Sequence, residues 1–132
     1  MKKVKLVDIS KLKSHERVNK NHLKRIIREF QTSRVIRNPV VIDRKTFVVL
    51  DGHHRVAALK ILGCQKIPVM FVNYQSNKVR VYLRRKNLLQ EIIKEIVIKR
   101  AFSGFCFPIK TTRHYIKGRI ENRKIPLSAC RA

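Results

Sequence analysis

The chain has 132 residues, 44% of them hydrophobic, which is enough for one domain with a buried core. Thirty-two Lys and Arg residues against eight Asp and Glu give a net charge of +24. This balance indicates a polyanionic partner or phosphorylated substrates, although a composition rich in Lys, Arg and Ile is also typical of heat-adapted proteins. No apolar run approaches the roughly 20 residues of a membrane span, and the N-terminus lacks the apolar stretch of a signal peptide. We therefore expect a cytoplasmic protein without a membrane partner.

The three cysteines, Cys64, Cys106 and Cys130, stand at wide and irregular spacing. No Cys-x-x-Cys pair occurs, so a zinc knuckle or a thiol redox motif is not indicated. Free cysteine in such a chain is usually a small buried apolar residue, and this is what we expect here.

Apolar patterning in the first half of the chain predicts strands that alternate with helices. The predicted strands are short and rich in branched residues, and they cover 4–12, 39–43, 47–50 and 67–72. The middle two of these strands are expected to form a hairpin. A first helix is predicted to begin near Asn19 or Asn21, since either residue can cap it. A second helix is predicted to follow Gly52 and to end at Gly63.

The second half of the chain has fewer turn signals. A helix is predicted over 86–102, where apolar residues recur at helical spacing, and Gly104 is expected to end it. Residues 105–114 are predicted to form a loop, and 125–127 a last short strand. Without internal repeats, these elements predict an α+β domain with a small mixed β-sheet packed with helices.

The sharpest feature is a buried-type strand that leads through Asp51 and Gly52 directly into a helix. This geometry points backbone N–H groups and the positive end of the helix dipole at the turn, where an anion can bind. Gly52 allows the backbone to approach a phosphate closely. His53, His54 and Arg55 add side-chain donors, and Asp51 can hold Mg²⁺ against phosphates. The alternative is a basic helical turn in solvent, but cations at a helix N-terminus oppose the dipole, which favours an anionic ligand.

A second candidate lies in the predicted loop over 105–114. It combines hydroxyl groups with cationic groups in a single run: Lys110, Thr111, Thr112, Arg113 and His114. Hydroxyls beside an arginine suit a carboxylate or a phosphate. The alternative is a basic loop that is simply solvated.

A third candidate is Glu16, in the predicted loop before the first helix. Acidic residues are scarce in this chain. A carboxylate near a phosphate donor can accept the proton of a hydroxyl group that attacks phosphorus. The alternative is an acid that flanks a helix N-terminus and interacts with its dipole.

Taken together, these segments resemble the ParB/sulfiredoxin-like superfamily, and within it the free L-serine kinases of the SerK/SbnI type. The resemblance is carried by 50–63 with its Asp-Gly-His-His-Arg turn, by the following Ile-Pro-Val at 67–69, by 13–16, and by 103–114. These segments occur in the expected order and span most of the chain. Sulfiredoxins have a reactive cysteine in the turn, where His53 and His54 stand here. ParB partition proteins have a Gly-Glu-Arg-Arg-like box and a helix-turn-helix, neither of which is clear in this sequence.

The resemblance implies phosphoryl transfer from ATP or ADP to free L-serine, giving O-phosphoserine, with Mg²⁺ as cofactor. It implies one ParB/sulfiredoxin-like domain over 1–132, with a nucleotide-binding core over about 1–75 and a helical segment and substrate loop over about 76–132. The implied roles are a catalytic base at Glu16, a magnesium ligand at Asp51, donor phosphate binding by Gly52, His53, His54 and Arg55, and serine binding by Lys110, Thr111, Thr112, Arg113 and His114.

Two other functions remain open at this point. The charge of +24 supports a ParB-like DNA-binding or nuclease module, so nucleic acid stays an alternative partner. The same turn also suits a nucleotide-binding regulator without catalytic activity. The sequence leaves the donor, the acceptor beyond a small hydroxylated compound, and the oligomeric state undetermined.

Overall fold

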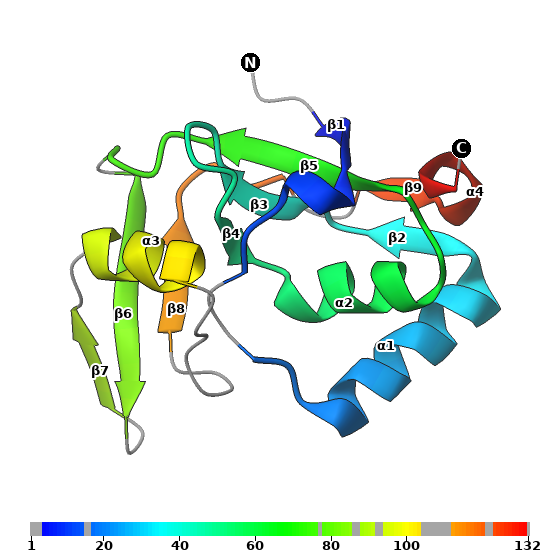
Figure 1. Ribbon diagram of the computed structural model, residues 1–132, viewed down its shortest axis with the longest axis horizontal. Coiled ribbons are helices and arrows are strands. Elements are labelled where there is room, and N and C mark those ends of the chain that lie inside the picture. The colour runs from blue at the N-terminus through cyan, green and yellow to red at the C-terminus, as the bar shows by residue number, and fades with distance from the viewer. Residues whose placement is uncertain are drawn as a thin grey trace.

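The computed structural model of the chain describes residues 4–14, 17–76, 78–85, 88–91, 94–103, 112–120 and 123–131. At its centre is a four-stranded sheet, with the order β1 (Val4–Asp8), β5 (Lys66–Val72), β3 (Val40–Asp43) and β4 (Val49–Asp51) (Figure 1). β3 and β5 are parallel, whereas β1–β5 and β3–β4 are antiparallel. The predicted hairpin, the edge strand at the N-terminus and the mixed sheet are therefore confirmed.

One face of this sheet is covered by helices and by a short ribbon. These elements are η1 (Ile9–Lys11), α1 (Lys20–Ser33), α2 (His53–Ile61), the antiparallel pair β2 (Val35–Arg37) and β9 (Lys124–Pro126), and α4 (Leu127–Cys130). Figure 1 shows α1 and α2 side by side below the sheet. The helix expected to begin near Asn19 is confirmed, because Asn19 caps α1.

The other face carries a second sheet and a helix. The antiparallel sheet has the order β7 (Leu88–Glu91), β6 (Val79–Arg85) and β8 (Thr112–Ile116), and the helix is α3 (Lys94–Ser103). In Figure 1 these elements form the left side of the molecule, and α1 and α2 form the lower right.

Strand alternation explains why the central sheet has a core on both faces. All four residues of β3 are buried. Val40 and Ile42 pack into the core beneath α1 and α2, whereas Val41 packs with Val79 and Val97 on the other side. Successive side chains of a strand point to opposite faces, so one short strand supplies both cores. The two cores hold the end of β4, where the candidate turn begins, between them.

The sequence prediction fails in the second half of the chain. The predicted helix over 86–102 is wrong in its first part, since β7 pairs there with β6, and α3 begins only at Lys94. Thr112, Arg113 and His114 were predicted in a loop but belong to strand β8. A short apolar run fits both periodicities, and the long-range partner strand decides between them. Residues 104–111 lie outside the part of the chain that the structure describes.

Two of the three cysteines are buried, as the sequence predicted. Cys64 and Cys130 are free and buried, and burial together with the nearby Cys64 raises the pKa of Cys130 to about 11. Cys106 lies outside the described residues.

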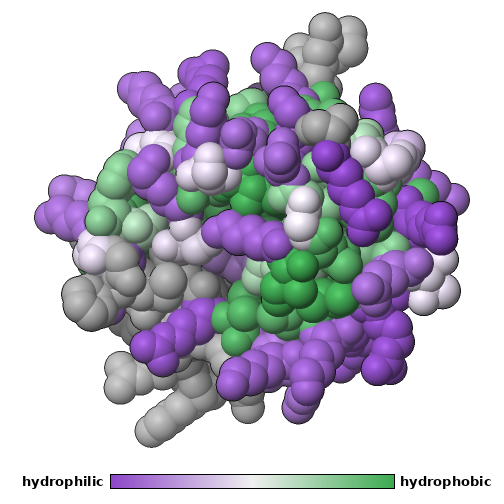
Figure 2. Space-filling model, turned by 45° about the vertical axis from the view of Figure 1, so that its right-hand side comes forward, coloured by the Kyte–Doolittle hydropathy of each residue, from purple (hydrophilic) through white to green (hydrophobic). Residues whose placement is uncertain are grey.

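Within the described part of the chain, no helix has the length and apolar character required to cross a membrane. Figure 2 shows hydrophilic side chains around a smaller hydrophobic patch on one face.

Candidate functional site

The turn between β4 and α2 requires glycine at position 52. Gly52 has a φ of 108°, a left-handed conformation that residues with a Cβ rarely adopt. A Cβ built at this position would lie 2.8 Å from Cγ2 of Val40, closer than packed atoms come. Gly52 is also the N-cap of α2, and among the described residues no side chain caps this helix. The backbone therefore presents the start of α2 at the end of β4, as the sequence predicted.

The start of α1 lies against the same turn. The backbone N–H of Asn19 donates to Nε2 of His54 at 2.9 Å. The side chain of Asn19 caps α1 by accepting from the N–H groups of Asn21 and His22. The rings of His22 and His54 meet edge to face, with their centroids 4.4 Å apart. Asn19 thus links the two helices, and their N-termini open on the same side of the molecule (Figure 1). The positive ends of the two helix dipoles therefore lie close together, an arrangement that favours an anion.

Arg55 anchors the turn to the connection between β2 and β3. Its Nη1 donates to the carbonyl oxygens of Asn38 and Pro39, the latter at 3.3 Å, and its Nη2 lies 3.4 Å from Oδ2 of Asp51. The side chain is only 17% exposed. Burial lowers the pKa of the Arg55 guanidinium, and Asp51 counters part of that effect, but the group stays protonated. These contacts tie α2 to the connection between β2 and β3, so the predicted grip of Arg55 on phosphate stays a prediction.

Asp51 has a second cationic partner, which the sequence reasoning missed. Nη2 of Arg119, in the segment after β8, donates to Oδ2 of Asp51. The Asp51 side chain is 40% exposed and that of Arg119 25%. Nothing in the local pattern separates Arg119 from the many other basic residues, so only the fold reveals this contact. Through it, the C-terminal part of the chain reaches the turn.

Asp51 is also the carboxylate at the turn that suits a magnesium ion. Among the described residues, no group of three or more His, Cys, Asp or Glu side chains could hold a metal. Mg²⁺ at nucleotide sites usually takes one or two carboxylates and obtains its other ligands from phosphates and water. A single half-exposed carboxylate beside the turn is compatible with that pattern.

His114 is held by a buried tyrosine on the other side of the site. Its Nε2 lies 2.9 Å from the hydroxyl of Tyr74, which is fully buried. Burial, with a smaller contribution from Asp43, raises the pKa of the Tyr74 hydroxyl far above its usual value. Lys94 donates to the backbone oxygens of Tyr74 and Ser76, and its Nζ lies 5.3 Å from the Tyr74 ring centroid. These contacts orient the His114 ring on β8.

The structure therefore brings together only part of the predicted site. Asp51, Gly52, His53, His54 and Arg55 form one turn, in which His53 is buried at 9% exposure. His114 is positioned by Tyr74. The other predicted residues lie outside the described residues or have side chains of which the structure gives no description: Glu16, Lys110, Thr111, Thr112 and Arg113.

Comparison with known proteins places these features in a family. Residues 1–99 match the model of the ParB N-terminal domain. An ATP-dependent L-serine kinase of Staphylothermus marinus is 31% identical over 101 residues, which cover 68% of this chain and 40% of the relative. The ADP-dependent L-serine kinase SerK of Thermococcus kodakarensis is 31% identical over 80 residues, which cover 58% of this chain and 33% of the relative. The chain thus spans less than half the length of these curated relatives.

A solved structure gives the same fold. The structure of a free serine kinase in complex with AMP aligns with a TM-score of 0.87 at 16% sequence identity. The alignment covers 96% of this chain and 93% of that chain. This likeness confirms the predicted α+β fold class, and the family match supports a ParB-like core over residues 1–99.

Proposed function

We propose that this chain, which belongs to the ParB N-terminal domain family, is a kinase that phosphorylates free L-serine. The phosphoryl group would come from ATP or ADP, and the products would be O-phosphoserine and ADP or AMP. The observation that carries the proposal is the pair of helix N-termini joined by Asn19 and His54 at the Gly52 turn. The names of the relatives that align with the chain support the choice of acceptor.

The donor nucleotide would lie with its phosphates at the turn. Backbone N–H groups at the start of α2, with His53 and His54, would bind phosphate oxygens, while Arg55 keeps the turn in place. Phosphoryl transfer depends mainly on positioning and on neutralisation of charge, both of which a fixed helix N-terminus provides. Asp51 would hold Mg²⁺, whose chemistry here is to neutralise charge on the phosphate oxygens.

The acceptor would enter from the side of Glu16 and β8. Glu16 precedes Asn19, the cap of α1, by three residues in the sequence. Glu16 would accept the proton of the serine hydroxyl while that oxygen forms a bond to phosphorus and the bond to the leaving phosphate oxygen breaks. His114, oriented by Tyr74, would contact serine or the transferred phosphoryl group together with Lys110, Thr111, Thr112 and Arg113.

The test is a product assay with purified protein, Mg²⁺, L-serine and either ATP or ADP, read by mass spectrometry. We expect phosphoserine with at least one donor, and a rate that falls roughly 100-fold or more in Glu16→Gln, because a general base typically contributes that much. Nucleotide binding, measured by calorimetry, should change little in the same variant.

The matched control is Glu29→Gln, which removes a carboxylate from an exposed position on α1. It should retain full activity. Absence of product with both donors would reject the kinase, and binding of nucleotide without turnover would favour a regulator. Full activity in Glu16→Gln would reject the base while leaving the kinase intact.

A further inference from the structure

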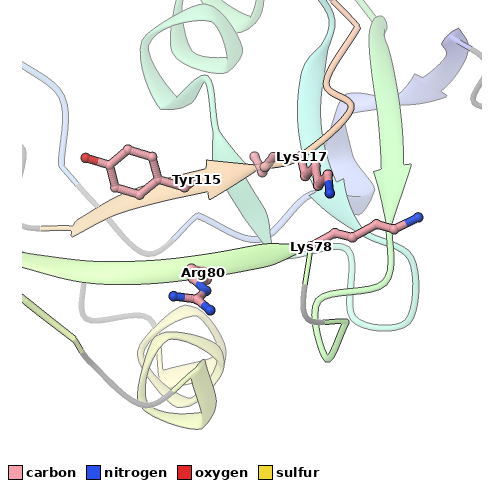
Figure 3. Close-up of a pocket in the computed structure, with 5 residues that line it drawn as sticks. Lys78, Arg80, Tyr115 and Lys117 are labelled. Atoms are coloured by element: carbon pink, nitrogen blue, oxygen red, sulfur yellow. The ribbon is translucent and has the colours of Figure 1, made fainter.

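A second cationic site lies at the adjoining ends of β6 and β8 and shares no lining residue with the Gly52 turn. Five residues line an open pocket of about 520 Å³: Lys78, Arg80, Tyr115, Ile116 and Lys117. Three of the five are cationic, and none carries a carboxylate. Figure 3 shows Arg80 on β6 and Tyr115 on β8, with Lys78 and Lys117 beside the adjoining ends of these strands.

The strand register explains why these side chains gather on one surface. Arg80 pairs directly with Tyr115, and the N–H of Lys117 donates to the carbonyl of Lys78 at 2.8 Å. Val79, the first residue of β6, lies between Lys78 and Arg80, and its side chain points into the core. Because the strand alternates, Lys78 and Arg80 share the outer face, and both are exposed. The pocket is therefore a surface of two cross-strand pairs.

This arrangement gathers positive charge on one surface. Like charges opposite each other on neighbouring strands repel, and a backbone hydrogen bond holds Lys78 and Lys117 together just beyond the paired ends of β6 and β8. Arg80 adds a third positive charge on the same surface. A bound polyanion would offset this repulsion better than a single monovalent anion would.

Tyr115 indicates which class of anion binds at this surface. Its side chain is a large ring that is 43% exposed, within a pocket that is otherwise basic. An exposed aromatic ring among cations is the combination with which proteins bind single-stranded nucleic acid, since phosphates contact the cations while a base stacks on the ring. A nucleic-acid strand can continue beyond an open pocket at a sheet surface. The net charge of +24 would attract such a polyanion from a distance.

We propose that this surface binds single-stranded nucleic acid, with phosphates on Lys78, Arg80 and Lys117 and one base stacked on Tyr115. This binding is separate from the kinase activity and does not depend on it. None of the four side chains belongs to the turn or to the acceptor site.

The test measures binding of a fluorescent 12-nucleotide single strand by anisotropy over a range of salt concentrations. The triple variant Lys78→Glu, Arg80→Glu, Lys117→Glu should bind at least 30-fold more weakly than the unchanged chain. The slope of log affinity against log salt should decrease in magnitude by about 2, because three phosphate contacts are lost. Tyr115→Leu should weaken binding roughly tenfold, whereas Tyr115→Phe, which keeps the ring, should bind as the unchanged chain does.

The matched control reverses three exposed lysines elsewhere, Lys5, Lys60 and Lys124, and so changes the net charge by the same amount. Equal loss in the two triple variants would overturn the proposal, because binding would then follow net charge alone. Equal or tighter binding of a duplex of the same length, with no effect of Tyr115→Leu, would overturn it as well. Thermal unfolding of each variant separates loss of binding from loss of folding.

Discussion

Two regions of the molecule meet at Asp51, and they are built differently. The Gly52 turn is held by backbone geometry, by the core beneath Val40 and by the buried contacts of Arg55. The described part of the β6–β8 region and the segment after it make their contacts through polar side chains, in particular Arg119 on Asp51 and His114 on Tyr74.

Under the proposed function, this difference would separate two tasks. A phosphate group is the same in every nucleotide, so a rigid turn suits it. An acceptor differs from one kinase to another, and contacts between individual side chains can be exchanged without disturbing the fold. We therefore expect damage to the turn to affect stability and nucleotide binding together, and damage to the β8 side to affect chemistry with smaller effects on stability.

The largest effect should follow Gly52→Ala. The added Cβ would meet Val40 at 2.8 Å in a backbone conformation with a φ of 108°. Left-handed strain and overpacking together should lower the free energy of unfolding by about 2–4 kcal/mol and abolish tight nucleotide binding. Urea unfolding and calorimetry measure the two quantities. Gly63→Ala is the control, because its φ is 76° and nothing lies within 4 Å of the added Cβ. It should cost only about 1 kcal/mol, and an equal loss in both variants would contradict the role of the Val40 contact.

A smaller effect is expected for Arg119→Ala. Without Arg119, the charge of Asp51 is less neutralised and repels nucleotide phosphates. Binding of ADP without Mg²⁺ should weaken roughly tenfold, or about 1.4 kcal/mol, as calorimetry can measure. Added Mg²⁺ should reduce the difference. Arg123→Ala removes an exposed arginine and should have little effect. Tighter binding in Arg119→Ala would show that Arg119 blocks the site and does not help to form it.

The smallest effect concerns Tyr74→Phe and its dependence on pH. At neutral pH, loss of the hydrogen bond to His114 should cost about 1 kcal/mol. The pKa of Tyr74 is raised in the folded protein, so the unfolded chain releases this proton first, from pH 10 upward. Stability of the unchanged chain should therefore fall above pH 10 by about 1.4 kcal/mol per pH unit more than that of Tyr74→Phe.

Urea unfolding between pH 8 and 11 measures this difference. The control is Tyr115→Phe, whose ring is 43% exposed. Its stability at neutral pH should equal that of the unchanged chain. Parallel curves for Tyr74→Phe and the unchanged chain would contradict the burial of the Tyr74 hydroxyl.

The features predicted correctly from the sequence are local. Asn19 as a cap, the hairpin before Asp51 and the glycine that starts α2 each depend on residues close together in the chain. The contacts that were missed join distant segments, such as Arg119 with Asp51 across 68 positions. Likewise, β7 was predicted as helix because its partner β6 is what makes it a strand. Periodicity does not contain that information.

The buried position of Arg55 determines which groups of the turn would attract a ligand. The carbonyl groups of Asn38 and Pro39 hold its guanidinium within the fold, so the attraction that the turn offers an anion comes largely from backbone dipoles. Peptide groups have no proton to lose near neutral pH and no rotamers to freeze. A nucleotide arriving at such a preorganised site would incur little ordering entropy there.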